Sequence, residues 1–467
     1  MKRRNVLLGG AAVISSPAIG KFCLAAQAAG AADPNRLNQD LTPLGGERAA
    51  SASGLVPAWT GGVTEPPAGW SPGMLPPDLF GDEKPLFKVT AANVAQYANL
   101  LCDGQKEMLK RYGSAGFRFD VYPTHRTAAA PQYVYDNTFK NVTRAQPVAG
   151  GLVQGFDGAI NGVPFPILSD DPSVAGAQAM WNHLLRWGGQ FANMTFCAMV
   201  IGNNQRVLTD AWDFNIRYEY YNPNMTRETL GDVFANYYLS YVAPPNTAGG
   251  KFVTNFSLRS DRTPSSAYEY LVGEGRIREA PQTQYDIPAT QYADAINYDE
   301  SYLFTGPINR YTWKVVGKKE LIVPYNQSAL FRGQQEDVLG YQFINPDLVR
   351  NEVHRCWVIE AQLAPGARMT EPVRRFYLDE DTWAAMMAES YDDQGNLWKY
   401  GENFNEVHPD LPGTTVICAL VYNFQSAEYA YGGVFYNAPA PLGGGINFKP
   451  QPASLFDPQS MADSGGL

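Results

Sequence analysis

Histidine and cysteine, the side chains that most often perform chemistry, are few and scattered in this chain. The four histidines, none in the H-x-x-x-H spacing that zinc sites use, are His125, His183, His354 and His408. The chain has no G-x-S-x-G nucleophile elbow and no familiar cysteine-peptidase signature. His354 and Cys356 lie two apart and would share a strand face, which we interpret as a core position beside Trp357. We therefore expect no catalytic residues, no metal ligands and no cofactor.

Three further motifs have a simple structural interpretation. The oxygen-rich segment 392–396 lacks the ligand order of a calcium loop, so we interpret it as a hairpin turn. The glycines at 443–445 do not connect a strand to a helix with a lysine, as phosphate binding requires. We interpret Lys318-Lys319 as a solvated turn and Asp299-Glu300 as solvated loop charges.

The chain is instead rich in aromatic side chains, which make up 13% of it and include 27 tyrosines. A curled sheet with aromatic residues on its concave face could shelter an apolar ligand. Such a ligand binds through buried area, at about 25 cal/mol per Å², and leaves no polar motif in the sequence. Most aromatics of this kind form the core, but together they predict a ligand-lining set: Phe252, Phe256, Tyr268, Tyr270, Tyr311, Trp313 and Trp357.

Consecutive hairpins between about residues 192 and 436 would position these aromatics. In 251–259 apolar and polar residues alternate, which is typical of a strand with one buried face. A long antiparallel meander curls because strand twist accumulates. The sequence thus predicts an α+β fold, an open antiparallel barrel with helices over its concave face. The predicted strand pairs include 267–272 with 276–280, 311–315 with 321–325, and 354–363 with 368–378.

Helical spacing of apolar residues appears in three places. The first begins at Thr90 and is interrupted at 103–105, and the second runs from Pro172 to Gly188. The third runs from Thr226 to Leu239, with apolar residues at 230, 233, 234 and 237. These segments are the predicted helices.

The first 28 residues resemble a cleaved export signal. Lys2, Arg3 and Arg4 precede an apolar stretch, and small residues at 26–28 offer a cleavage site. The arginine pair also fits a twin-arginine signal. The apolar stretch is too short and too interrupted for a permanent membrane span, and the residues before Cys23 do not form a lipobox. We expect an exported, periplasmic protein that does not span the membrane.

Charge and cysteine content limit the partners and leave disulfide pairing open. The formal charge is −10, and removal of the four cations of the signal brings it to −14. Such an acidic protein is not suited to nucleic acid or to an anionic membrane surface. Export permits disulfides, but the remaining cysteines could equally be buried thiols. These cysteines are Cys102, Cys197, Cys356 and Cys418.

Nine short motifs resemble one large family of exported proteins. The motifs are LTPLGGERA (41–49), VPAWTGG (56–62), GDEKPLF (81–87), DVYPT (120–124), GVPFPI (162–167), WNHLL (181–185), VVGKKE (315–320), VPYN (323–326) and FYLDED (376–381). The family is the domain-of-unknown-function family thirteen twenty-nine, whose members are often labelled outer-membrane lipoprotein-sorting proteins of the LolA/LolB-like type. The resemblance runs from about residue 38 to residue 436.

This resemblance implies a LolA/LolB-like half-open antiparallel β-barrel with helices covering the concave face. It implies similarity to periplasmic carriers of acyl chains, and partnership with a resistance-nodulation-division-type transporter and an outer-membrane barrel. It supplies no catalytic residues. The domains expected are a signal peptide (1–28), a proline- and glycine-rich arm (29–88), the LolA/LolB-like domain with helical insertions (89–436) and an irregular tail (437–467).

We therefore expect a periplasmic binding or carrier protein for a hydrophobic ligand such as a lipid, an acyl chain or a sterol-like molecule. Two alternatives stay open. In one, the protein is an accessory subunit that docks on a transporter through a sheet edge or its proline-rich arm. In the other, it is an exported hydrolase, which would require His183, His354 or His408 to lie in a pocket beside a carboxylate and a hydroxyl.

Overall fold

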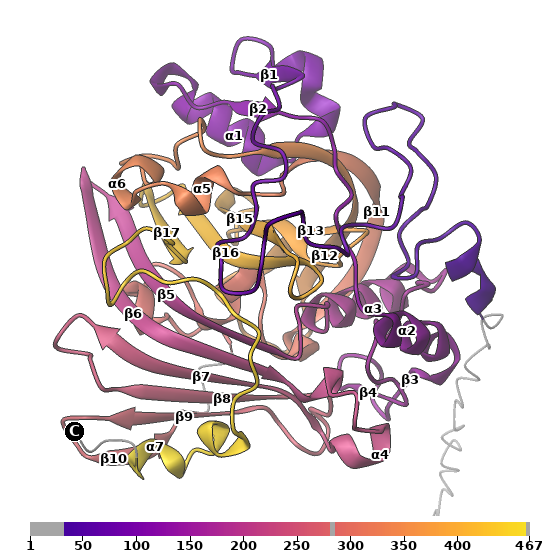
Figure 1. Cartoon of the computed structure of the whole chain (residues 1–467), viewed down its shortest axis with the longest axis vertical. Helices are drawn as coiled ribbons and strands as arrows, with labels where there is room; N and C mark the ends of the chain where they lie inside the picture. The colour runs from indigo at the N-terminus through magenta and orange to yellow at the C-terminus, as the bar shows by residue number, and fades with distance from the viewer. Residues whose placement is uncertain (1–31, 281–284, 464–467) are drawn as a thin grey trace, which may run out of the picture. The chain divides into compact units, whose positions relative to one another are not determined.

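A computed structural model describes residues 32–280 and 285–463 of the chain. The expected export signal over residues 1–28 lies outside these described residues. The described part is organised by one large sheet, with helices and irregular segments packed on both of its faces (Figure 1).

Within residues 32–280 and 285–463 the large sheet has 15 strands. Their order is β1-β2-β12-β13-β14-β15-β16-β17-β5-β6-β7-β8-β9-β10, with β11 paired to β12. The strands of this sheet are β1 (Phe87–Val89), β2 (Phe119–Val121), β5 (Phe191–Gly202), β6 (Gln205–Tyr218), β7 (Val233–Ala243), β8 (Lys251–Ser257), β9 (Ser266–Leu271), β10 (Arg276–Glu279), β11 (Tyr311–Pro324), β12 (Asn351–Leu363), β13 (Val373–Asp379), β14 (Ala385–Tyr391), β15 (Leu397–His408), β16 (Gly413–Asn423) and β17 (Glu428–Gly433). A separate two-stranded sheet joins β3 (Gln146–Pro147) to β4 (Phe156–Asp157).

The sheet is almost wholly antiparallel and does not close into a barrel. Neighbouring strands from β12 to β10 run antiparallel, and β2 meets β12 in parallel. Among the described residues β10 pairs only with β9, at one end of the sheet. The predicted α+β class with a half-open antiparallel sheet is therefore confirmed.

Three of the predictions on elements are wrong. The interruption predicted at 103–105 is the first turn of helix α1 (Asp103–Tyr112). The 311–325 region is not a hairpin, because β11 runs unbroken from Tyr311 to Pro324 with a bulge between Val315 and Gly317. Lys318 consequently lies in a strand and pairs with Glu380 and Glu47 instead of standing in a solvated turn. The predicted helix 226–239 is one short helical turn followed by β7.

Helices are few, and the predicted helix from Pro172 is confirmed as α3. The helices are α1 (Asp103–Tyr112), α2 (Gln132–Arg144), α3 (Pro172–Leu184), α4 (Arg227–Leu230), α5 (Ala329–Arg332), α6 (Gln335–Val338) and α7 (Ser460–Asp463). Asp171 caps α3 by accepting a hydrogen bond from the Ser173 N–H, and Pro172 begins the helix.

Two segments cover one face of the sheet, which we call the inner face. The helix α3 lies so close to β11 that a Cβ on Gly176 would stand 2.5 Å from the backbone nitrogen of Lys314. The second segment, residues 285–310, lies farther along the same face, and we call it the covering segment. It is mostly irregular and contains the 3₁₀ turns η5 (Thr290–Tyr292), η6 (Tyr298–Leu303) and η7 (Ile308–Arg310). The inner face is thus covered by one helix and one irregular segment.

The arm over residues 32–88 is mainly irregular and is fixed to the sheet by buried charges. Arg126 donates to the backbone oxygens of Glu47 (2.7 Å) and Pro57 (3.2 Å). Its guanidinium also forms a two-pronged pair with Asp381, at 2.7 and 2.6 Å. Both side chains of this pair are 2% exposed, so the arm is tied down by a desolvated ion pair.

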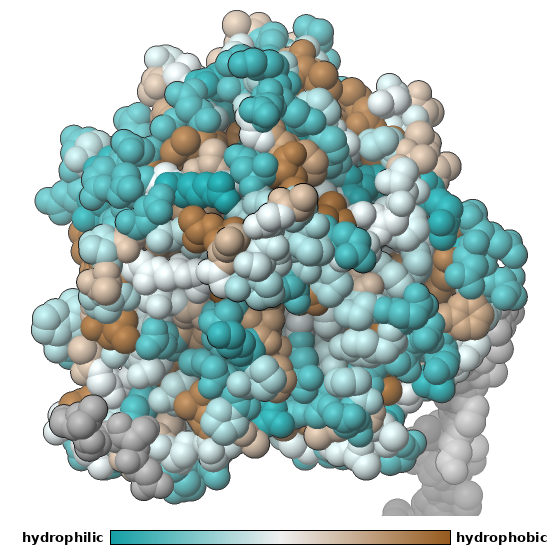
Figure 2. Space-filling model, in the orientation of Figure 1, coloured by the Kyte–Doolittle hydropathy of each residue, from teal (hydrophilic) through white to brown (hydrophobic). Residues whose placement is uncertain are grey.

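The described residues contain no helix that is both long and apolar enough to cross a bilayer. On the face of the molecule in Figure 2, hydrophobic residues are scattered among hydrophilic ones.

Candidate hydrophobic-ligand site

A cavity lies between the inner face of the sheet and the covering segment. Its volume is about 100 Å³, measured as the space open to the centre of a water-sized sphere. A single water needs roughly 10–15 Å³ on this measure, so the cavity has room for part of a ligand. The side chains around it come mainly from β5 to β8, β16, β17 and the covering segment, and include Phe196, Trp212, Phe214, Tyr237, Leu239, Phe252, Thr254, Phe256, Gln291, Tyr292, Tyr298, Glu300 and Tyr302.

Strand register brings these aromatics into one layer. Phe196 pairs with Trp212 across β5 and β6, and Phe214 pairs with Leu239 across β6 and β7. Leu239 in turn pairs with Phe252 of β8. Directly opposed residues of antiparallel strands point to the same face, so this register places a continuous apolar surface under the covering segment.

The lining aromatics contact one another mostly edge to face. Tyr237 lies between Phe214 and Phe256, with ring centroids 5.3 and 4.7 Å away. Gly432 of β17 makes room for the covering segment, because a Cβ there would overlap the Tyr292 hydroxyl. The cavity therefore has rigid aromatic walls and a close-fitting cover.

Buried ion pairs anchor the covering segment to the sheet. Asp299 bonds to Arg374 at 2.8 Å, and Glu300 bonds to Lys399 at 2.6 Å. Lys399 also contacts Glu371 at 2.7 Å. The prediction that Asp299 and Glu300 are solvated loop charges is wrong, because each is 3% exposed.

Burial controls the protonation of these acids. Burial raises the pKa of Asp299 to about 6. Burial, together with the negative charge of Glu371, raises the pKa of Glu300 to about 7. Burial would also raise the pKa of Glu371, but Lys399 and Arg374 lower it to about 2. Of this group, Glu300 also lines the cavity.

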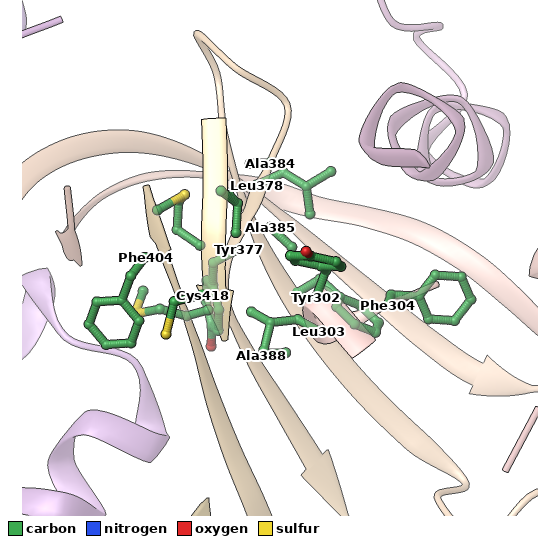
Figure 3. Close-up of a cluster of buried hydrophobic side chains, with 14 of the residues drawn as sticks. Tyr302, Leu303, Phe304, Tyr377, Leu378, Ala384, Ala385, Ala388, Phe404 and Cys418 are labelled. Carbon is green, nitrogen blue, oxygen red and sulfur yellow. The ribbon is translucent and has the colours of Figure 1, made fainter. Parts of the chain in front are cut away.

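Next to the ion pairs, the covering segment packs apolar side chains against the face of the sheet. Figure 3 shows Tyr302, Leu303 and Phe304 lying beside Ala385 and Ala388 of β14, within one buried cluster. All five residues are less than 9% exposed. The covering segment is therefore part of the core and not a loosely attached loop.

The structure places only two of the seven predicted lining residues at the cavity, Phe252 and Phe256. Tyr268 and Tyr270 point to the opposite face, because the β8–β9 register pairs them with Val253 and Lys251.

The other three predicted lining residues lie in packed regions away from the cavity. Trp313 packs on Phe304 and donates its N–H to the Ile308 carbonyl at 2.8 Å. Tyr311 donates to the Glu371 carbonyl at 2.9 Å. Trp357 lies under the Lys318 ammonium, 4.7 Å from the ring centre.

Sequence reasoning missed most of the wall. Trp212 and Phe214 alternate with polar residues on β6, a signal that was available. The helical spacing over residues 226–239 predicts a helix at Tyr237, and nothing local marks the covering residues Gln291 and Tyr292.

The buried histidines lie outside the cavity. His183 links α3 to its surroundings: its Nδ1 accepts from the Ala385 N–H at 3.0 Å, and its Nε2 lies 3.1 Å from the Phe304 oxygen. Burial lowers the pKa of His183 to about 3 and that of His408 also to about 3, so both imidazoles are neutral near pH 7.

His354, Asp379 and Asp381 are the described residues whose spacing could hold a metal ion. Burial would lower the pKa of His354, but hydrogen bonds to Asp379 and Glu352 raise it to about 9. Asp381 is already bonded twice by Arg126. An imidazolium and a guanidinium thus already balance the carboxylates, and this group fits an internal ion network better than a metal site.

The open question of the cysteines is settled by the structure. Cys102, Cys197, Cys356 and Cys418 are all buried and free. Burial raises the pKa of each thiol, which keeps it protonated and unreactive.

Comparisons with known proteins identify the family. The model of the family described as "Protein of unknown function (DUF1329)" matches residues 88–462. PA3922 of Pseudomonas aeruginosa is 36% identical over 404 residues, which cover 84% of this chain and 85% of that protein.

Two solved structures overlap the chain in part. One is a DUF1329 family protein from Desulfovibrio piger, with a TM-score of 0.39 and 12% identity over 56% of this chain and 91% of that one. The other is the LolA superfamily protein NE2245 from Nitrosomonas europaea, with a TM-score of 0.32 and 9% identity over 58% of this chain and 92% of that one. On the strength of the family model and the P. aeruginosa relative, the chain belongs to the DUF1329 family.

Proposed function

We propose that this protein is a periplasmic carrier that holds a hydrophobic molecule between its sheet and the covering segment. The ligand class is a lipid, an acyl chain or a sterol-like molecule. The partners we propose are a resistance-nodulation-division-type transporter, from which cargo is received or to which it is given, and an outer-membrane barrel.

One observation carries the proposal: the largely aromatic cavity under the covering segment. Each methylene that leaves water for such a site contributes about 0.8 kcal/mol. Rigid aromatic walls retain this gain because few side chains must be ordered on binding. No strongly polar contact is needed, which fits a chain without a catalytic signature.

The test replaces a small side chain of the cavity wall with a large one that occupies the space of the ligand. Thr254 of β8 lines the cavity and is 7% exposed, so Thr254→Trp places an indole in the ligand space. We expect delipidated wild-type protein to bind a fluorescent fatty-acid probe, and Thr254→Trp to weaken that binding at least about tenfold, a loss of about 1.4 kcal/mol. Native mass spectrometry of gently purified wild-type protein should show a co-purified lipid.

Thr312→Trp is the matched control, because Thr312 is an exposed threonine on β11 outside the cavity. It should bind the probe as the wild type does. Equal weakening in both variants would show that a tryptophan merely perturbs the sheet. Failure of the wild type to bind any probe or retain any lipid would refute the carrier function.

A second function, an accessory subunit that docks through its arm, is favoured by one observation. The arm exposes Met74, Leu75 and Leu86, which are 56%, 42% and 60% exposed. Exposed apolar residues in one segment often mark a contact surface. If this function holds, changing all three to serine should abolish cross-linking to the transporter and leave probe binding intact.

A further inference from the structure

Two buried polar atoms at the cavity have no hydrogen-bond partner among the described residues. They are Nε1 of Trp212 and Oε1 of Gln291. Trp212 is 3% exposed and Gln291 is 6% exposed, so bulk water does not satisfy them. Buried polar atoms are rarely left unpaired in native proteins, so two of them at one cavity point to a polar group bound there, from a ligand or from an ordered water.

The two side chains flank the same tyrosine. The Trp212 ring lies 6.1 Å from that of Tyr241, and Nε2 of Gln291 donates to the Tyr241 hydroxyl at 2.7 Å. The backbone oxygen of Gln291 accepts from Thr209 at 2.7 Å, which fixes η5 against β6. Tyr298, whose pKa is raised by burial, lines the same region. The donor and the acceptor therefore belong to two side chains that both neighbour Tyr241.

The chemistry of these atoms selects the ligand's polar group. An indole N–H can only donate, whereas an amide oxygen can only accept. A hydroxyl group complements both because it donates and accepts. The Tyr241 hydroxyl can donate or accept, so the Gln291 amide can also be flipped, with its oxygen on Tyr241 and its NH₂ facing the cavity. A ligand hydroxyl complements this second arrangement as well, because its oxygen accepts from the NH₂. An ether or ester oxygen only accepts.

Charge disfavours an anionic head group relative to a neutral one, without preventing an apolar chain from binding. Glu300 is the ionisable acid at the cavity, and the lysine beside it, Lys399, is shared with Glu371. Arg374 is likewise engaged by Asp299 and Glu371. With both cations engaged in this way, a carboxylate ligand would approach Glu300 without a counter-charge.

We infer that the carried molecule is an uncharged alcohol, with a long-chain or polycyclic apolar body and a hydroxyl group bound between Trp212 and Gln291. This inference rests on the proposed carrier function and narrows its ligand class. Because Trp212 belongs to β6 and Gln291 to the covering segment, the hydroxyl would join the sheet to its cover.

The test compares four ten-carbon compounds on the delipidated full chain. 1-Decanol, its isomer 1-methoxynonane, decanoate and decylamine compete with the neutral fluorescent probe N-phenyl-1-naphthylamine. We expect 1-decanol to displace the probe at about a 5- to 20-fold lower concentration than the isomeric ether, and decanoate to be the weakest competitor.

Substitutions then locate the effect. Gln291→Met removes the amide and should bring the alcohol-to-ether ratio close to one. Trp212→Phe keeps an aromatic ring and should weaken both compounds. Trp398→Phe is the control, because Trp398 donates to Asn423 on β16 and does not line the cavity.

The outcomes separate the two proposals. If none of the compounds binds and the probe does not either, the carrier function fails. If decanoate or decylamine binds most tightly, or the ether equals the alcohol, the alcohol assignment is overturned while the carrier function stands. The wild-type series decides this even if a variant does not fold.

Discussion

Glu402 is a carboxyl group buried on β15 with one polar contact. It is 3% exposed and accepts a hydrogen bond from the Tyr400 hydroxyl at 2.7 Å. Burial raises its pKa to about 7, whereas an unfolded glutamate titrates near pH 4.3. Between these values the folded protein keeps a proton that the unfolded chain has lost, so the stability contributed by Glu402 falls as pH rises from 4.5 to 7.

This predicts a pH-dependent effect of Glu402→Gln. Glutamine keeps an acceptor for Tyr400 but cannot ionise, so the variant should match the wild type at pH 4.5 and be more stable by about 1–3 kcal/mol at pH 8. Urea unfolding at pH 4.5, 6 and 8 would measure this. Glu65→Gln, at an exposed position, should give no such trend. An unchanged difference at all three pH values would contradict the prediction.

Residue-level roles were the hardest to predict from sequence. Asp299-Glu300 has the polar pattern of a surface loop, and only the fold brings Arg374 and Lys399 against it. The missing polar partner at Trp212 is equally invisible in the chain, because it depends on which atoms remain unpaired after packing. Sequence identifies which groups can ionise or donate, but not what surrounds them.

At the scale of elements, α3 and β11 meet at a glycine. A Cβ on Gly176 would stand 2.5 Å from the Lys314 nitrogen and 2.6 Å from the Trp313 carbonyl carbon. These are backbone atoms that cannot rotate away. We expect Gly176→Ala to destabilise the protein by about 1–3 kcal/mol through overpacking, although alanine favours helix.

The measurement is the midpoint of thermal unfolding, with Val174→Ala as the control on the same helix. Val174 is 39% exposed and its shortening should change stability by less than about 0.5 kcal/mol. Equal effects of the two substitutions would show that α3 does not depend on this close approach.

Element types were predictable where one periodicity dominated. The alternation in β8 correctly predicted a strand with Phe252 and Phe256 on one face. Apolar residues at 230, 233, 234 and 237 instead have the spacing of a helix. The strand β7 forms there because pairing with β6 and β8 overrides this local pattern. The face on which Tyr268 and Tyr270 lie depends on the register between β8 and β9, which the sequence alone does not reveal.

At the scale of the whole chain, the C-terminal tail completes the outer side of the sheet. Phe456 and Met461 pack against Tyr238 and Val253, away from the cavity. The Lys251 ammonium donates to the Met461 backbone oxygen at 2.7 Å. The sequence predicts an irregular tail, but the tail contains η8 (Ala453–Phe456) and α7, and both lie over this small cluster.

Removal of residues 451–467 should therefore expose Tyr238 and Val253 without opening the cavity. We expect increased binding of an anilinonaphthalene dye and a lower unfolding temperature, with fatty-acid probe affinity within about twofold of the wild type, because the tail does not line the cavity. Removal of residues 464–467 alone is the control. Loss of probe binding in the longer truncation would show that the cavity depends on the tail.

Strand β17 pairs with β5, and this contact joins segments separated by about half of the chain. Both contribute to the cavity, through Ala430 and Gly432 on one side and Phe196 on the other. Contacts so distant in sequence form slowly, because the entropy of closing a long loop is lost before the contacts contribute favourable free energy. During biosynthesis the cavity wall would be complete only after nearly every residue has been made. A chain that is still being synthesised therefore has no finished cavity in which to bind a cargo molecule.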